Sequence, residues 1–354
     1  HKDETTKAQA EKERLEKEKA IKEAVEKIQA ENKKAEEQAK AAKDTVTNLE
    51  TFKAQLEKLV KEKEEAINNA TTETEKEKLT TEKVAVEKEL TAKVTELKTE
   101  TEKAVKLENK VEEIKKLEEV KNEAVKDIAN DKSLTKEEAK QLEAIVKTAS
   151  LKDTLVAKVV ENGSSEEIKV SFDNSTVKAS NFSVTKADKE TVAKVEELVK
   201  KADENLSVVK TIDLHFTDSK GNTINKQGET RAVTVAVVAN EGEKLEVYYV
   251  NGDKLEKVPS VYKDGKLTFF TNHFSLYTIV SKTVASDQNT PVPVTPVPSE
   301  NNKPSDKPST PTKPNSEETP VQPEAPATSE KPKAEKGEAL VQPELPELNI
   351  NKLN

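Results

Sequence analysis

The first 162 residues contain neither glycine nor proline, and that absence constrains the fold more than any other feature of the chain. A long stretch without these helix breakers favours continuous helix. Apolar residues recur in it at separations of three and four, beginning with Ile21, Val25 and Ile28 and resuming at Val86 after an interruption at residues 68–83. This spacing predicts a coiled-coil seam. The sequence leaves two arrangements open: an antiparallel hairpin, or one rod in a parallel coiled-coil homodimer.

The seam can bury only a small apolar area, because alanine occupies several of its positions and the polar residue Asn32 occupies another. A buried asparagine costs stability but fixes register and partner number. Asn32 is therefore either a determinant of helix pairing or a polar residue in a poorly packed stretch. Within the interruption, Thr72 and Glu75 form a candidate capping box, which predicts the start of a second helix.

Composition divides the rest of the chain. Ten of the eleven Phe and Tyr residues lie between 172 and 277, and all but one of the fifteen prolines lie at 291 or later. We therefore predict a multi-domain protein: an all-α coiled coil or helical bundle, a β-rich (α+β) module and a disordered Pro-rich tail. The expected segments are a coiled coil or hairpin at 1–117, a three-helix unit at 118–162, the module with one helix at 164–283 and the tail at 284–354.

Several function classes are disfavoured by composition. The chain has no cysteine, so thiolate chemistry and disulfides are excluded. Acidic and basic residues are interspersed without a basic patch, which argues against a nucleic-acid partner. We find no assembled set of acid, base and nucleophile and no metal-ligand spacing, and therefore expect no enzyme, cofactor or metal. A chain that opens at His1 without methionine is expected to be a processed product.

Residues 118–162 suggest three short helices. Apolar stripes mark the first two, and Thr135 with Glu138 offers a capping box for the second. Ser150 with Asp153 is a candidate cap for a third helix. The competing interpretation is a β-hairpin around Asn162 and Gly163.

Three stretches of this unit, "NEAVKDIAND", "LTKEEAKQLEAIVKTA" and "SLKDTLVAKV", resemble the albumin-binding three-helix module of streptococcal and peptostreptococcal surface proteins. The resemblance implies a host plasma protein as partner. We place the candidate binding residues on the second helix. Its expected core residues are Leu142, Ile145 and Val146, and the residues expected nearer its exposed face are Glu138, Lys140 and Gln141.

From Ile168 onward the apolar period changes to two, which predicts strands. An amphipathic helix is expected at 185–202, and the Val-rich stretch at 232–238 is expected to form a central, covered strand. His215 alternates with buried positions and is expected to face solvent. His273 precedes the last strand and lacks a catalytic or metal-binding partner in the sequence, so we interpret it as a structural residue that satisfies backbone groups.

The stretches "DLHFTDSKGNTI", "VYYVNGDKLEKV" and "DGKLTFFTNHFSLYTIV", followed by Pro-rich sequence, resemble the β-module of Gram-positive (streptococcal-type) wall-associated surface proteins. The resemblance implies a non-catalytic stalk element followed by a wall-spanning tail that contacts peptidoglycan. The sortase motif of such proteins is matched only in its first two residues by "LPELN" at 345–349.

Together these patterns predict a secreted protein at the cell wall and surface of a Gram-positive bacterium. We expect an adhesin that captures a host plasma protein of the albumin, immunoglobulin or fibrinogen class through its helical region. The alternative is a structural stalk that positions another domain of a larger protein.

Overall fold

The computed structural model describes residues 2–161, 163–224 and 227–284. It confirms the predicted fold class, since long helices are followed by a β-rich region with two antiparallel sheets. The predicted Pro-rich tail lies, from residue 285 onward, outside the described residues.

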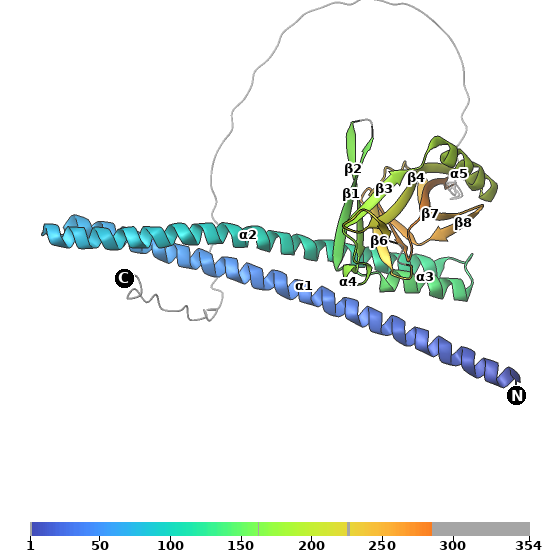
Figure 1. The fold of residues 1–354 in the computed structure, drawn as a ribbon, viewed down its shortest axis with the longest axis horizontal. Coiled ribbons are helices and arrows are strands. Elements are labelled where there is room, and N and C mark those ends of the chain that lie inside the picture. The colour runs from blue at the N-terminus through green and yellow to red at the C-terminus, as the bar shows by residue number, and fades with distance from the viewer. Residues whose placement is uncertain (1, 162, 225–226, 285–354) are drawn as a thin grey trace, which may run out of the picture. The chain divides into compact units, whose positions relative to one another are not determined.

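Two long helices, α1 (Lys2–Asn69) and α2 (Glu73–Asn130), form an antiparallel hairpin (Figure 1). The contacts between them fix the direction: Lys63 is 2.5 Å from Glu82, near the turn, and Lys43 is 3.4 Å from Glu108. The side chain of Thr72 accepts a hydrogen bond from the backbone amide of Glu75, so the predicted cap at the start of α2 is confirmed. Of the two arrangements that the sequence left open, the structure has the hairpin.

The predicted seam is the contact surface between the two helices. Its buried residues are Ile28, Ala39, Ala42, Leu49 and Leu56 on α1, and Val86, Ala104 and Ile114 on α2. Asn32 lies in this seam and donates a hydrogen bond to Glu118 across the hairpin at 3.1 Å. The structure therefore favours the pairing role for Asn32, because its amide reaches a specific partner on the other helix.

The predicted three-helix unit is wrong in two of its three helices. Residues 118–130 continue α2 without a break, and Asp153–Glu161 is strand β1. Only the middle helix, α3 (Lys136–Thr148), is confirmed, with the complete capping box of Thr135 and Glu138. The strand is stabilised by pairing with the next strand, β2 (Ser164–Phe172), where Leu155 and Ala157 lie opposite the core residues Val170 and Ile168. This antiparallel pair is the β-hairpin that the sequence offered as the competing interpretation.

The β-module consists of two antiparallel sheets (Figure 1). The first has the order β1-β2-β6-β10-β9, and in the second the order is β3-β4-β11-β7-β8 with β5 paired to β4. The remaining strands are β3 (Asn181–Lys186), β4 (Leu206–Thr217), β5 (Thr223–Ile224), β6 (Arg231–Ala236), β7 (Glu243–Asn251), β8 (Lys254–Val258), β9 (Ser260–Lys263), β10 (Lys266–Thr271) and β11 (Leu276–Thr283).

The inner faces of the two sheets share one core, which includes Phe172, Phe216, Phe269 and Tyr277. As predicted, β6 is the central strand of its sheet and its valines are buried, but it ends at Ala236, and Val238, the last residue of the predicted strand, is 85% exposed. The predicted amphipathic helix is α5 (Lys189–Ala202), and it begins four residues later than expected because residues 185–186 end β3. A single-turn helix, α4 (Asn174–Val177), follows β2.

Candidate functional site

The six predicted binding residues lie together on α3 but divide between two faces. Glu138, Lys140 and Gln141 are exposed, and Glu138 is engaged by its capping box, in which its carboxylate accepts from the Thr135 amide at 2.8 Å. Val146 is fully buried, and Leu142 and Ile145 are partly buried against the same cluster. Val146 is therefore packed inside the protein, whereas Leu142 and Ile145 keep part of their surface exposed at the edge of the same cluster.

That cluster joins the helices to the β-module. We call it the junction cluster, and its buried members are Val120, Ala124 and Ile128 on α2, Val146 and Ala149 at α3, Ala232 on β6, Val261 on β9 and Phe270 on β10. Phe270 and Val146 are both fully buried. Because buried residues from α2, α3 and three strands of the first sheet meet here, burial of apolar surface holds the hairpin base on that sheet.

A buried lysine completes the junction at the end of α3. Lys121 on α2 is 6% exposed and donates hydrogen bonds to the carbonyls of Ala149 at 2.9 Å and Lys147 at 3.3 Å. These are carbonyls that the last turn of α3 leaves without helical partners. Burial lowers the pKa of Lys121, and the nearby Glu118, 3.6 Å away, partly offsets that effect. Lys121 therefore fixes the angle between α2 and α3.

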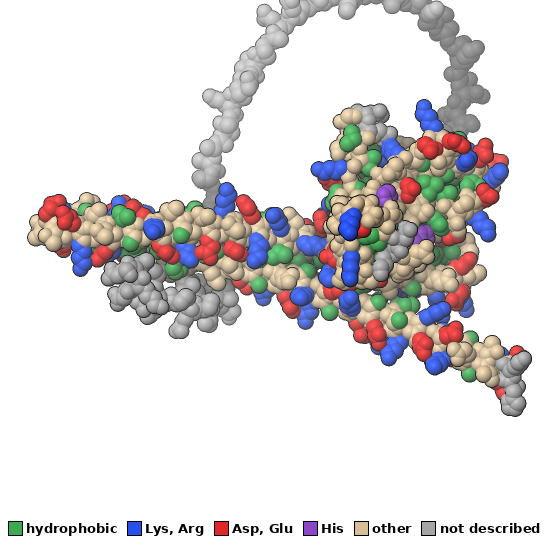
Figure 2. Space-filling model, in the orientation of Figure 1, with side chains coloured by type: hydrophobic (Ala, Val, Ile, Leu, Met, Phe, Trp, Pro, Cys, Tyr) green, Lys and Arg blue, Asp and Glu red, His purple; other side chains and the backbone are tan. Residues whose placement is uncertain are grey.

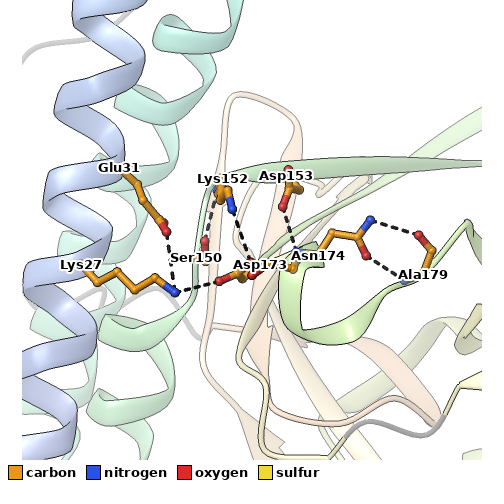
Figure 3. A network of polar contacts seen from close by, with 9 residues as sticks. Lys27, Glu31, Ser150, Lys152, Asp153, Asp173, Asn174 and Ala179 are labelled. Carbon is orange, nitrogen blue, oxygen red and sulfur yellow. Dashed lines mark hydrogen bonds and ion pairs between the residues drawn. The ribbon is translucent and has the colours of Figure 1, made fainter.

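Figure 3 shows a second set of contacts, which centres on Asp173. This carboxylate caps α4 by accepting from Ser175, and it receives Lys27 of α1 at 3.2 Å and Lys152, which precedes β1, at 3.8 Å. Burial opposes ionisation of Asp173, but the hydrogen bonds from Ser175 and Lys27 outweigh it and hold its pKa below the usual value. Asp153 supports the same turn by accepting from the Asn174 amide at 2.8 Å.

Where α2 meets the module, the acidic residues belong to the helical part and the lysines to the module, which is the reverse of the pair between Lys27 and Asp173. Glu113 pairs with Lys169 at 3.5 Å, Glu119 pairs with Lys263 at 3.3 Å, and Asp131, just after the helix, lies 3.9 Å from Lys257. Acidic residues of the helical part thus meet lysines of the module, whereas Lys27 meets an acid. The two surfaces are therefore complementary in charge, which favours one orientation of the hairpin on the sheets.

His273 lies in the loop before β11, where the sequence placed it. Its backbone carbonyl accepts from the Tyr277 hydroxyl at 2.7 Å, and its Nδ1 lies 3.1 Å from the same hydroxyl. Burial and the charge of Arg231 lower the pKa of His273. Arg231 is itself 1% exposed, with its guanidinium 4.5 Å from the ring of Phe274, and burial lowers its pKa to about 10. The contacts of His273 with Tyr277 join the loop to β11, and Tyr277 is part of the core, which supports the structural interpretation. His215 is half-buried rather than fully solvent-facing.

Two clefts border the junction. One of about 560 Å³ lies between the α2–α3 connection and the β7–β9 region, and in its lining Lys257 pairs with both Asp131 and Glu246. A second of about 470 Å³ is lined by Val25 and Ile28 of α1 and by Lys121. The described residues contain no group of three or more His, Cys, Asp or Glu side chains placed to hold a metal ion.

Asp173, Lys27, Lys121 and Arg231 are the polar residues that sequence reasoning missed. The "FDNS" stretch at 172–175 carries a turn signal that marks Asp173 as a helix cap, but nothing local indicates that Lys27 of the distant helix α1 reaches it.

Comparison with known proteins gives no family assignment. No family model matches the sequence, and no solved structure matches the chain. Within the described part of the chain, no helix combines the length and the apolar character that a membrane span requires.

Proposed function

We propose that this chain is a non-catalytic surface protein of a Gram-positive cell wall in which the β-module holds a helical hairpin that captures a host plasma protein. One observation carries the proposal: among the described residues, every hydrogen bond and ion pair between hairpin and module uses Lys27 or residues at and beyond Lys110. Residues 44–109, which we call the distal hairpin, make none. The module thus binds the hairpin near its base, and the distal hairpin makes no polar contact with the described residues of the module. A long helical pair of this kind is suited to present side chains to a protein partner.

The distal hairpin also has the surface for such a role. Figure 2 shows lysine and acidic side chains alternating along it, with small apolar patches between them. Such a surface is suited to weak contacts with a partner protein. When many copies on one cell bind together, weak contacts give high avidity although each copy has low affinity. The resemblances in sequence support the cell-wall location, the peptidoglycan contact of the tail and the plasma class of the partner. Since Leu142, Ile145 and Val146 are packed in the junction, the distal hairpin is the better candidate for the contact surface.

A structural stalk is the second candidate, and one observation favours it. Before Ile21, the helix positions that continue the α1 seam hold charged residues such as Glu11, Arg14 and Glu18 instead of apolar ones, and Arg14 pairs with both acids. Ion pairs one turn apart stabilise a solvated helix that has no partner. Such a helix acts as a spacer.

A plasma pull-down on the immobilised chain tests the proposal. The control is a chain whose hairpin is shortened by two heptads on each helix, at residues 49–62 and 83–96, so that the seam register and the module contacts are kept. We expect one saturable plasma protein on the full chain and a large loss of it on the shortened chain. Equal retention by both would contradict the role of the distal hairpin, and a folded full chain that retains nothing would leave the stalk function.

A further inference from the structure

Helix α2 carries a second stripe with coiled-coil spacing, in addition to the seam that packs on α1. Its residues are separated alternately by four and three positions, and we call it the outer stripe: Thr80, Val84, Glu87, Thr91, Val94, Lys98, Thr101 and Val105. Separations of four and three keep all of them on one side of the helix over roughly 37 Å. The whole stripe lies within the distal hairpin.

The outer stripe consists of three valines, three threonines and two charged residues, and all of these except the half-buried Glu87 are exposed. Val84, Val94 and Val105 are 57%, 44% and 48% exposed, and the coiled-coil spacing places them on the same side of the helix. The hydroxyls of its threonines point back along the helix: Thr80 donates to the carbonyl of Lys76 at 2.7 Å, and Thr101 to that of Leu97 at 2.7 Å. Because these hydroxyls are already bonded, the threonines present mainly their methyl groups.

The outer stripe is complementary to the same stripe of a second copy when the two helices run in opposite directions. When a second copy of α2 is aligned antiparallel, valines and threonines meet along the stripe and its two charged residues meet each other. The facing pairs are Thr80 with Val105, Val84 with Thr101, Glu87 with Lys98 and Thr91 with Val94, and each occurs twice by symmetry. A parallel alignment in register sets Glu87 against Glu87 and Lys98 against Lys98. Charge complementarity thus selects a second copy in the antiparallel orientation.

We infer that two copies of this chain associate through the outer stripe of α2, with the helices antiparallel and Glu87 paired to Lys98 of the other copy. Glu87 lies 3.4 Å from Lys83 in the same helix, so its carboxylate joins a short row of alternating charges. The alignment sets Lys110, where contacts with the module begin, opposite Glu75 beside the partner's hairpin turn, so the two modules stay apart. Association of two copies goes beyond the proposed function and requires no plasma ligand. An experiment can therefore disprove the association without disproving plasma-protein capture, and the reverse.

Analytical ultracentrifugation of the full chain over a wide concentration range measures whether it dimerises. Charge-reversal variants then test whether the outer stripe is the dimer interface. Glu87→Lys and Lys98→Glu each create two like-charge contacts and are expected to weaken dimerisation about tenfold. An equimolar mixture of the two variants restores opposite charges at both contacts and is expected to recover the dimer. Lys88→Glu, an exposed reversal beside the stripe, is the matched control and should change little.

Cross-linking tests the orientation, because the chain has no cysteine of its own. We expect a disulfide when Val84→Cys chains are mixed with Thr101→Cys chains, and none within either variant alone. A chain that stays monomeric at all concentrations, a dimer indifferent to the charge reversals, or disulfides formed by Val84→Cys alone would each overturn the inference.

Discussion

At the scale of single residues, Asp173 shows how one buried carboxylate joins distant segments. Its position after a strand and before a short turn of helix is a local feature, but the lysines that pair with it come from α1 and from the segment before β1. Only about a tenth of its side chain is exposed. A carboxylate so placed stabilises the fold in its charged form, and its contribution must therefore depend on pH.

We predict that Asp173→Asn, which keeps the cap and removes the charge, lowers the free energy of unfolding at pH 7 by about 1–2 kcal/mol. The folded pKa of Asp173 lies below the unfolded one, so its stabilisation is present above the unfolded value and is lost as the pH falls through the folded value. Urea unfolding at neutral pH and near pH 3 should therefore give a difference between variant and parent that shrinks in acid. Asp44→Asn, at an exposed position of α1, is the control. A difference of the same size at both pH values would show that charge is not the cause.

At the scale of elements, the helix starts were the most predictable features and β1 the least. Thr72 and Thr135 cap their helices as predicted, because capping depends on residues a few positions apart. For residues 153–161, the apolar spacing favoured a helix, because "LVAKVV" does not alternate cleanly, and a β-hairpin was only the competing interpretation. Pairing with β2 decided the matter, because nine residues of β1 find partners there.

The cap of α2 gives a second prediction. Thr72→Ala is expected to lower the stability of the hairpin by about 1 kcal/mol, because the amide of Glu75 loses its partner. Thermal unfolding followed by far-UV circular dichroism measures the change. Thr99→Ala makes the same chemical change inside the helix and should be neutral or stabilising, since alanine has the higher helix propensity. Equal losses in the two variants would exclude capping as the reason.

At the scale of the whole molecule, the junction cluster decides whether the hairpin base and the module behave as one unit. Phe270 is a fully buried member of this cluster and comes from β10 of the first sheet. All four tyrosines lie in the module and the chain has no tryptophan, so tyrosine fluorescence reports the module, whereas far-UV circular dichroism reports mainly the helices.

We predict that Phe270→Ala lowers module stability by about 3–5 kcal/mol and separates the two unfolding signals, because the cavity removes the contact that couples them. Phe52→Ala, on the hairpin under Lys93, is the matched control and should affect the helical signal alone. Coincident unfolding of both signals in the Phe270 variant would mean that the polar contacts suffice for coupling.

The predicted binding site shows the limit of sequence reasoning. The amphipathic pattern of α3 correctly separates Val146 from Gln141 as inner and outer residues. It cannot say what the inner face meets, and here it meets α2 and the first sheet instead of a third helix. The contacts of Lys121 with the end of α3 and of Asp173 with Lys27 were beyond prediction for the same reason, since these partners are separated by 26 residues or more along the chain.

The sequence by itself determined the long helices, their seam, the caps and the strands with clear alternation, because each depends on residues within a few positions of one another. Only the tertiary structure decided that the two helices form a hairpin, that residues 153–161 form a strand and that α3 is packed at a junction. These outcomes depend on contacts between distant segments, where burial and pairing outweigh local preference.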